Sequence, residues 1–381
     1  MTQAALSDIV KIVMGQAPPG TACNKSGEGV PFVKAGEFGD RRPHIREWTT
    51  KPLRMAEQDD TLVCVVGATA GKVNQGANCA IGRSVAAVRP DVARINADYL
   101  YRFLATNVGR LRGGSQGAAQ GVITRDMIGR LKLELPPLAE QRRIAAILDH
   151  ADAIRAKRRH ILADLDELIQ ATFLDMFGDV RTMRSLSSLV AEFRYGTSNK
   201  SGASGLPTLR IPNVIGGGID HEEIKTVTVT ESERDRLALS DGDLLFVRTN
   251  GNPDNVGRCA VFTESAVASA GFGGASWIFA SYLIRARLND PAAAPFVSTY
   301  LATHEGRKHL RDRAKTSAGQ YNVNTESIGS LPIPDVDDER HVEFASRLRR
   351  LTEQRAKARA ALLADDELFA SLQSRAFRGE L

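Results

Sequence analysis

The feature that most constrains the fold is a pair of long helix-forming stretches, one in the middle of the chain and one at its end. They follow the proline-bearing segments LELPP at 133–137 and LPIPD at 331–335. Proline fixes φ and disfavours helix in the preceding residue, so both segments are predicted to be extended entries into a helix. Neither proline nor glycine then occurs before Gly178 and Gly379. At ~1.5 Å per residue, each stretch would form a rod of about 55 Å.

Apolar residues in both stretches recur at alternating steps of four and three, which is the spacing of a coiled-coil seam. A helix with one apolar stripe must pack that stripe on something. One alternative is that each helix packs on its own globular domain, but the shared register favours pairing of the two. The predicted pairing residues are Ile144, Leu148, Leu162, Leu165 and Ile169 in the first helix and Phe344, Leu348, Leu351, Leu362 and Phe369 in the second.

A weak but long repeat relates the two halves of the chain. Asp166-Glu167-Leu168 recurs as Asp366-Glu367-Leu368, and Ile128-Gly129 recurs as Ile328-Gly329, each 200 residues later. LSDIV at 6–10 resembles LSSLV at 186–190, and Gln120 has a counterpart in Gln320. Matches that follow one order are hard to obtain by chance.

The repeat and the helices divide the 381 residues into four parts. Strand-like runs at 61–67, 84–90, 226–230 and 243–248 alternate with helical patterns at 96–111 and 294–310, so each globular half is predicted to be mixed α/β (α+β). We predict two globular domains in a pseudo-two-fold arrangement, separated by two long antiparallel coiled-coil helices. The predicted ranges are 1–135 and 179–334 for the domains and 136–178 and 335–381 for the helices.

Composition excludes some classes of protein. No stretch approaches the ~18–20 uninterrupted apolar residues of a membrane span, and we expect no signal peptide. The four cysteines are scattered, which argues against a zinc site or a disulfide framework and favours the cytoplasm. The net charge of +5 raises the expectation of a polyanionic partner only modestly.

Motifs that would indicate catalysis are incomplete. GATAGKV at 67–73 has three residues between its glycines and Val73 after the lysine, so it is not a Walker motif. GNPDN at 251–255 lacks the second proline and the aromatic residue of an amino-methyltransferase motif, and Glu223-Ile224-Lys225 lacks the upstream Pro-Asp of a nuclease. We therefore predict no catalytic residue and no metal site in this chain.

Basic and amide side chains gather instead in Gly/Ser-rich loops at corresponding places in the two halves. Arginine can bond guanine, glutamine and asparagine can bond adenine, and lysine neutralises phosphate. Each residue alone could be a solvated surface charge, but paired loops on two repeated domains favour a DNA-binding surface. The candidates are Lys72, Arg83, Arg112, Gln116, Gln120 and Arg125 in the first half, and Arg248, Asn250, Asn252, Arg258, Arg313, Lys315, Gln320, Tyr321 and Asn322 in the second.

LPPLAEQRRIAAILDHADAI at 135–154 resembles the first helical region of type I restriction–modification specificity subunits (S, or HsdS, chains), on the match of Pro136, Pro137, Leu138, Glu140 and Gln141. The ending DELFASLQSRAFRGEL resembles the second such region. GATAGKV with AIGRSVAAVRP, and VRTNGNPDNVGRCAVF, look like interiors of target-recognition domains. The second helix departs from the pattern, with IPDVDDERH at 333–341, where Arg340 is matched to Gln141.

The resemblance implies a non-catalytic subunit in which each target-recognition domain reads half of a split double-stranded DNA site and the helices set the gap. It implies two methyltransferase (M) subunits docked on the helices and restriction (R) subunits beyond them. S-adenosylmethionine, ATP and Mg²⁺ are expected on those partners, with no cofactor in this chain. Two alternatives stay open: a non-catalytic two-module adaptor on a coiled-coil strut, and a fused DNA methyltransferase or nuclease with unrecognised motifs.

Overall fold

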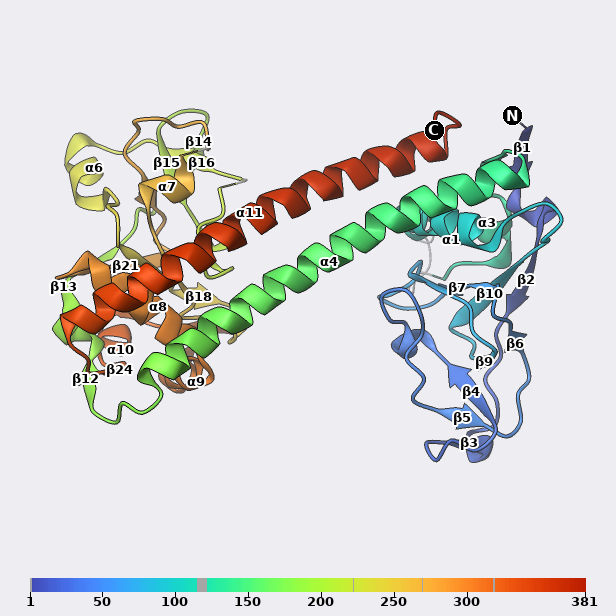
Figure 1. Cartoon of the computed structure of the whole chain (residues 1–381), viewed down its shortest axis with the longest axis horizontal. Coiled ribbons are helices and arrows are strands. Elements are labelled where there is room, and N and C mark those ends of the chain that lie inside the picture. Colours follow the sequence, from blue (N-terminus) through green and yellow to red (C-terminus); the bar gives the residue numbers. More distant parts are fainter. Residues whose placement is uncertain (1, 115–121, 222, 269, 318) are drawn as a thin grey trace. The chain divides into compact units, whose positions relative to one another are not determined.

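The computed structural model describes residues 2–114, 122–221, 223–268, 270–317 and 319–381. The chain forms two compact units. Unit 1 comprises Met1–Arg159 with Ala360–Leu381, and unit 2 comprises His160–Arg359. Each unit therefore contains one globular half and a part of both long helices, which Figure 1 labels α4 and α11.

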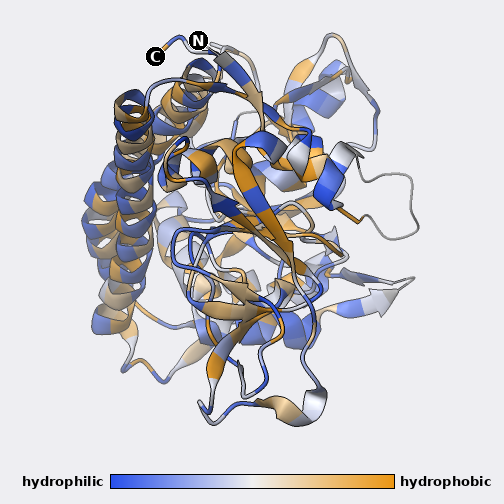
Figure 2. Cartoon of the chain, turned by 90° about the vertical axis from the view of Figure 1, so that its right-hand side faces the viewer, coloured by the Kyte–Doolittle hydropathy of each residue, from blue (hydrophilic) through white to orange (hydrophobic). Residues whose placement is uncertain are grey.

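The two predicted helices are confirmed as α4 (Leu138–Phe177) and α11 (Asp338–Ala376). In unit 1 the beginning of α4 packs with the end of α11, and in unit 2 the end of α4 packs with the beginning of α11. The helices therefore run antiparallel. Figure 2 shows hydrophilic residues along their outer surfaces, whereas the strands of the globular parts are largely hydrophobic.

The globular part of unit 1 is built on three sheets. Their strand orders are β2-β10-β7-β8, β3-β5-β4-β9-β6 and β1-β11. Between β10 and β11 the described residues form the helices α1 (Ala97–Thr106), α2 (Val108–Gly114) and α3 (Arg125–Gly129). The strand bounds are β1 Thr2–Ala5, β2 Val10–Met14, β3 Cys23–Asn24, β4 Val30–Val33, β5 Trp48–Thr49, β6 Met55–Ala56, β7 Thr61–Cys64, β8 Val73–Gln75, β9 Cys79–Ile81, β10 Val85–Pro90 and β11 Lys132–Leu135.

The globular part of unit 2 repeats this plan with the orders β13-β21-β17-β19, β14-β16-β15-β20 and β12-β24, and adds β18-β23-β22. Its helices are α5 (Ile211–Val214), α6 (Glu231–Leu237), α7 (Glu264–Val267), α8 (Ala294–Ala302), α9 (His304–Arg313) and α10 (Thr325–Gly329). The strand bounds are β12 Met183–Ser185, β13 Val190–Tyr195, β14 Ser201–Gly202, β15 Leu206–Leu209, β16 Lys225–Val227, β17 Leu244–Val247, β18 Thr249–Asn250, β19 Cys259–Val261, β20 Ile278–Phe279, β21 Leu283–Leu288, β22 Lys315–Ser317, β23 Gln320–Asn322 and β24 Pro332–Pro334.

Matching backbone bonds bear out the repeat. The amide of Leu6 donates to the carbonyl of Leu131 at 2.9 Å, and the amide of Leu186 donates to the carbonyl of Leu331 at 2.8 Å. The repeated glycines end the short helices α3 and α10, and each lies beside a serine. A Cβ on Gly129 would lie 3.4 Å from Ser7 Cβ, and one on Gly329 would lie 3.4 Å from Ser187 Cβ. The two glycines therefore occupy equivalent positions in the two copies.

The predicted helices over 96–111 and 294–310 are each divided in two. Asn107 separates α1 from α2 and returns its side-chain amide to the carbonyl of Phe103 at 2.9 Å. Thr303 separates α8 from α9 and caps α9 by accepting from the amide of Gly306. Polar side chains that bond the backbone at these positions favour a break over a continuous helix.

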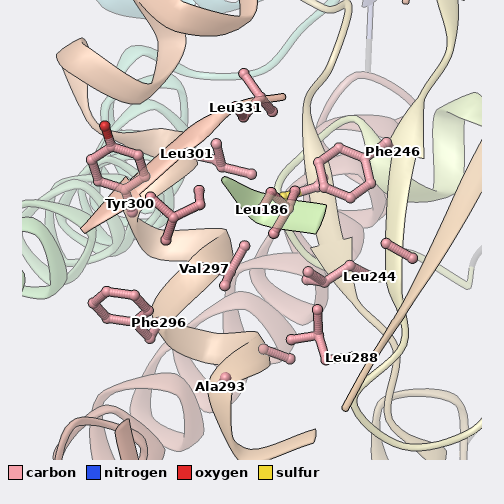
Figure 3. Packing of buried hydrophobic residues seen from close by; sticks show 14 of the residues in the cluster. Leu186, Leu244, Phe246, Leu288, Ala293, Phe296, Val297, Tyr300, Leu301 and Leu331 are labelled. Atoms are coloured by element: carbon pink, nitrogen blue, oxygen red, sulfur yellow. The ribbon is translucent and has the colours of Figure 1, made fainter. Parts of the chain in front are cut away.

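Each unit has a main core that includes residues of both long helices. In unit 1, Ile144 and Leu148 of α4 share a cluster with Phe369 and Ala376 of α11. In unit 2, Phe344 and Leu348 of α11 share a cluster with Phe173 of α4. Figure 3 shows the second cluster around Leu186, Phe246, Phe296 and Tyr300.

Candidate nucleic-acid interface

A small sheet in unit 2 brings together candidates that lie far apart in the sequence. Strand β18 pairs with β23, placing Asn250 opposite Tyr321, and β22 pairs with β23, placing Lys315 opposite Asn322. The hydroxyl of Thr249 donates to the side-chain oxygen of Gln320 at 2.8 Å. Five of the predicted DNA-contacting residues (Asn250, Lys315, Gln320, Tyr321 and Asn322) therefore share one surface element.

Arg248 immediately precedes this sheet and is exposed. Its guanidinium lies 4.9 Å from the ring centroid of Tyr195 and donates to the carbonyl of Ser281 at 3.3 Å. An arginine stacked on an aromatic ring is oriented in advance while its remaining N–H groups stay available. Sequence reasoning missed Tyr195 and the 60% exposed Tyr282, because a tyrosine at a strand end has no periodic signal of its own.

The turn between β18 and β19 is shaped by two other candidates. Asn250 Oδ1 accepts from the amide of Asn252 at 2.9 Å, and Asn252 Oδ1 accepts from the amide of Asp254 at 2.9 Å. Arg258 donates through Nε to the carbonyl of Asp254 at 2.8 Å. These are local side-chain bonds of turn-forming residues, so Asn252 and Arg258 shape the backbone of the predicted surface.

The side chain of Arg313 is turned toward the protein. It donates through Nε to the hydroxyl of Ser330 and through Nη2 to its carbonyl, both at 3.2 Å. The side chain is half-buried. Arg313 therefore joins the end of α9 to the end of α10.

In unit 1, Lys72 is half-buried and its ammonium donates to the carbonyl of Phe38 at 3.0 Å. The carbonyl of Lys72 accepts from Cys64 as that of Arg258 accepts from Val247, both at 2.8 Å. The structural counterpart of Lys72 is therefore Arg258. This correspondence between Lys72 and Arg258 follows from the pairing of the backbone, and the similarity of the side chains alone does not show it.

The other unit 1 candidates lie around the same loop. Arg83 is exposed after β9, and Arg125 is exposed at the start of α3. Arg112 of α2 donates through Nε to the carbonyl of Ala70 at 2.6 Å and so holds the 67–71 turn. Gln116 and Gln120 lie outside the described residues. The DNA contacts of all these residues stay predictions.

Buried charges lie in equivalent positions of the two main sheets and serve the fold. Arg89 bonds the buried Asp60, and Arg287 bonds the buried Asp243. These carboxylates raise the pKa of each arginine through hydrogen bonding. Burial raises the pKa of the Cys79 and Cys259 thiols to about 12, so neither is poised as a thiolate nucleophile. Across the described ranges, no cluster of side chains could hold a metal ion.

The helix pair is held by ion pairs that repeat with the chain. Arg155 bonds Asp366 at 2.5 Å in unit 1, and Arg355 bonds Asp166 at 2.7 Å in unit 2. The repeated Asp-Glu-Leu segment seen in the sequence therefore supplies the acidic partner in both units. Arg102, only 3% exposed, bonds Asp149 and Asp152 of α4 and attaches the globular part of unit 1 to that helix.

The predicted pairing residues differ in burial along the helices. Ile144, Leu148, Phe344, Leu348 and Phe369 are buried, whereas Leu162, Leu165, Ile169, Leu351 and Leu362 are partly exposed. Aromatic rings close each unit: Phe377 lies 5.3 Å from Tyr99, and Phe177 lies 4.8 Å from Phe296, between ring centroids. The end of α4 thus packs on the globular part of unit 2, and the end of α11 packs on the globular part of unit 1. This overturns the alternative that each helix packs only on its own domain.

The second helix begins differently from the first. Gln141 is fully buried and bonds the amide of Asn96 and the carbonyls of Arg94 and Pro136. Its counterpart is His341, because His341 lies three residues before the buried Phe344 and Gln141 lies three residues before the buried Ile144. The match of Gln141 to Arg340 was therefore wrong. Neither ring nitrogen of His341 has a hydrogen-bond partner in the part of the chain that the structure describes.

Two repeated α/β domains joined by an antiparallel helix pair define a two-domain protein with an exposed polar surface on loops and a small sheet. The family model described as "Type I restriction modification DNA specificity domain" matches residues 1–166. The type I restriction enzyme EcoKI specificity subunit of Escherichia coli (strain K12) is 26% identical over 397 residues, covering 92% of this chain and 82% of the relative.

The StySPI specificity subunit of Salmonella potsdam is 23% identical over 392 residues, with the same shares of 92% and 82%. The crystal structure of a type I system S subunit from M. genitalium has the same fold, with a TM-score of 0.62, 14% identity, and coverage of 99% of this chain and 96% of that one. The chain is therefore similar to the specificity subunits of type I restriction–modification systems over nearly its whole length. In the described residues, no helix is long and apolar enough to cross a membrane.

Proposed function

We propose that this chain is the specificity subunit of a type I restriction–modification system and binds double-stranded DNA. Each globular domain reads one half of a bipartite site, and α4 and α11 set the unread gap. The chain contributes no catalytic group. Two M subunits dock on the helices and carry S-adenosylmethionine, and R subunits carry ATP and Mg²⁺. The complex acts in the cytoplasm.

The observation that carries the proposal is the exchange of helix ends between the repeats. Phe369 and Ala376 of α11 lie in the core that contains Leu6 and Tyr99, and Phe173 and Met176 of α4 lie in the core that contains Leu186 and Phe296. A helix anchored in this way at both ends has a length fixed by its residue count, at ~1.5 Å per residue. Such a pair is suited to setting a distance between two reading domains.

The test is a matched insertion of one heptad in each helix. In an antiparallel pair, the numbers of two facing residues have a constant sum, which is 521 for Arg155–Asp366 and for Arg355–Asp166. The peptide bond after His160 therefore faces the peptide bond after Ala360. Seven residues in both places add about 10.5 Å and keep the seam in register. That length corresponds to about three base pairs at ~3.4 Å each.

We expect a complex carrying both insertions either to methylate a site with a longer gap and unchanged half-sites, or to lose methylation. Loss would follow because three base pairs turn DNA by about 100°, whereas a heptad turns the helix by only about 20°. An unchanged gap would contradict the proposal. The insertion in α4 alone is the control, because it breaks the register of the pair.

Two rival functions are separable by simple measurements. A fused methyltransferase would transfer methyl groups as the purified chain alone, and we expect no transfer without M subunits. An adaptor would bind no DNA, whereas a DNA reader binds with an affinity that falls steeply with salt. The salt measurement should include the M subunits if the chain binds weakly alone.

A further inference from the structure

A basic hollow of about 580 Å³ lies on unit 1 along strand β2 and helix α3. Its lining includes the four cations Lys11, Arg54, Arg125 and Arg130, together with one carboxylate, Asp126. Only Arg125 was expected from the sequence to contact DNA. The other three cations come from separate segments that the fold brings to one place.

Most of this charge is available to a ligand. The side chains of Lys11, Arg54 and Arg125 are exposed, and none has a hydrogen-bond or ion-pair partner among the residues that the structure describes. Arg130 lies 3.3 Å from Asp126, but their side chains are 82% and 75% exposed. Such an exposed pair contributes little stability, so it yields readily to a stronger anion.

The backbone beside the cations is also open. Strand β2 is the edge of its sheet, and β10 is its one strand partner among the described residues. Edge amides on the far side of β2 are therefore free to donate. Arginine, lysine and backbone N–H groups are the donors that proteins use toward DNA phosphates.

At three of these four positions, unit 2 carries an uncharged or acidic residue. Lys11 lies opposite Arg89 as Glu192 lies opposite Arg287, so a glutamate replaces the lysine. The offset of 200 between α3 and α10 sets Thr325 at the position of Arg125 and Ser330 at that of Arg130. The second copy folds without a cation at these three positions, so Lys11, Arg125 and Arg130 are free to serve a function other than folding.

We propose that this hollow binds phosphates of the DNA backbone beside the half-site that the first domain reads. The inference rests on the proposed function and deepens it. Arg125 lies two residues after Ile123, whose amide donates to the carbonyl of Val65. Val65 lies next to the loop that carries Lys72. The hollow therefore adjoins the candidate interface of unit 1. Phosphate contacts fix the position of the protein on DNA without specifying bases.

The test uses the full chain in complex with its M subunits and a duplex that carries its methylation site. The variant Arg125→Thr with Arg130→Ser installs the residues of the second domain, which the equivalent helix α10 tolerates. Each lost phosphate contact reduces the slope of log K against log salt by about 0.9. The loss of affinity between 50 and 200 mM salt should therefore become about tenfold smaller, with the methylated sequence unchanged.

Two controls complete the experiment. Thr325→Ala in unit 2 should leave the salt slope unchanged, and Asp126→Asn should strengthen binding because it removes the one carboxylate of the hollow. An unchanged slope in the double variant, while the wild-type complex binds its site, would overturn the inference. So would loss of M-subunit binding at normal DNA affinity, because the hollow would then accept an acidic protein segment at the sheet edge. A wild-type complex with no sequence-specific binding would instead refute the proposed function.

Discussion

Replacing Phe369 by alanine tests whether the end of α11 completes unit 1. The ring is 8% exposed and belongs to the cluster that contains Leu100, Leu104 and Leu148. The guanidinium of Arg155 lies 4.2 Å from its centroid, and that of Arg102 lies 5.8 Å away. Phe369 therefore joins the helix pair to the globular part at a point where two ion-paired arginines also meet.

The expected cost follows from this burial. Truncating a buried phenylalanine to alanine destabilises a core by about 3–5 kcal/mol. Loss of the two cation–π contacts adds about 0.5–2 kcal/mol, because the ring and both arginines are largely buried. A loss of about 4 kcal/mol would raise the population of open states of unit 1 by roughly 10³, since ~1.4 kcal/mol is a factor of ten.

Hydrogen exchange of the whole complex measures this effect segment by segment. We expect faster exchange in α1 and in the first turns of α4, although the substitution lies more than 200 residues away in the sequence. Leu368→Ala is the matched control, because the neighbouring side chain is 55% exposed and its loss should change stability by less than about 0.5 kcal/mol. If α1 kept its protection in Phe369→Ala while α11 alone frayed, the view of α11 as part of this core would be refuted.

Three further predictions concern the reading surface and the second helix. Arg248→Ala should weaken DNA binding more than Lys72→Ala, because Arg248 is exposed whereas Lys72 donates to the Phe38 carbonyl; equal titrations in a binding assay would contradict this. Exchanging residues 1–135 for the equivalent domain of a relative should change one half of the methylated site only, as sequencing of methylated DNA would show. Burial, with a smaller contribution from Arg184, lowers the pKa of His341 from about 6.5 in the folded state. As the pH falls, the unfolded chain binds this proton before the folded chain does. Unit 2 should therefore lose stability below about pH 6.5, until the pH reaches the pKa of His341 in the folded state. His341→Gln should remove this pH dependence in thermal melts at pH 5–7.5.

The helices and the repeat were predictable because their signals are local or periodic. Ile144, Leu148, Phe344 and Leu348 follow the seam spacing, and the structure buries all four. The repeated Asp166 and Asp366 were visible as matches, although only the structure shows that Arg355 and Arg155 are their partners. A repeat in sequence identifies equivalent positions without saying what each position contacts.

The surface features were not predictable for a different reason. Strands β18 and β23 are two and three residues long and lie about 70 residues apart, so neither alternation nor turn chemistry identifies their pairing. The stack of Arg248 on Tyr195 and the hollow of Lys11, Arg54, Arg125 and Arg130 likewise join distant segments. Side chains that face solvent carry no burial pattern, so their arrangement follows from the completed fold.

The two domains share what folding requires and differ in what faces outward. Both keep the buried acid beneath an arginine, Asp60 with Arg89 and Asp243 with Arg287, and both keep the glycine beside a serine. Their candidate reading residues differ, because Lys72 of unit 1 corresponds to Arg258 of unit 2, and the sheet of β18, β23 and β22 occurs in unit 2. Because direct readout depends on the donors and acceptors presented to base edges, two domains with unlike surfaces should read unlike half-sites. We therefore expect an asymmetric bipartite DNA site from a repeat whose two copies share their core and differ on their surface.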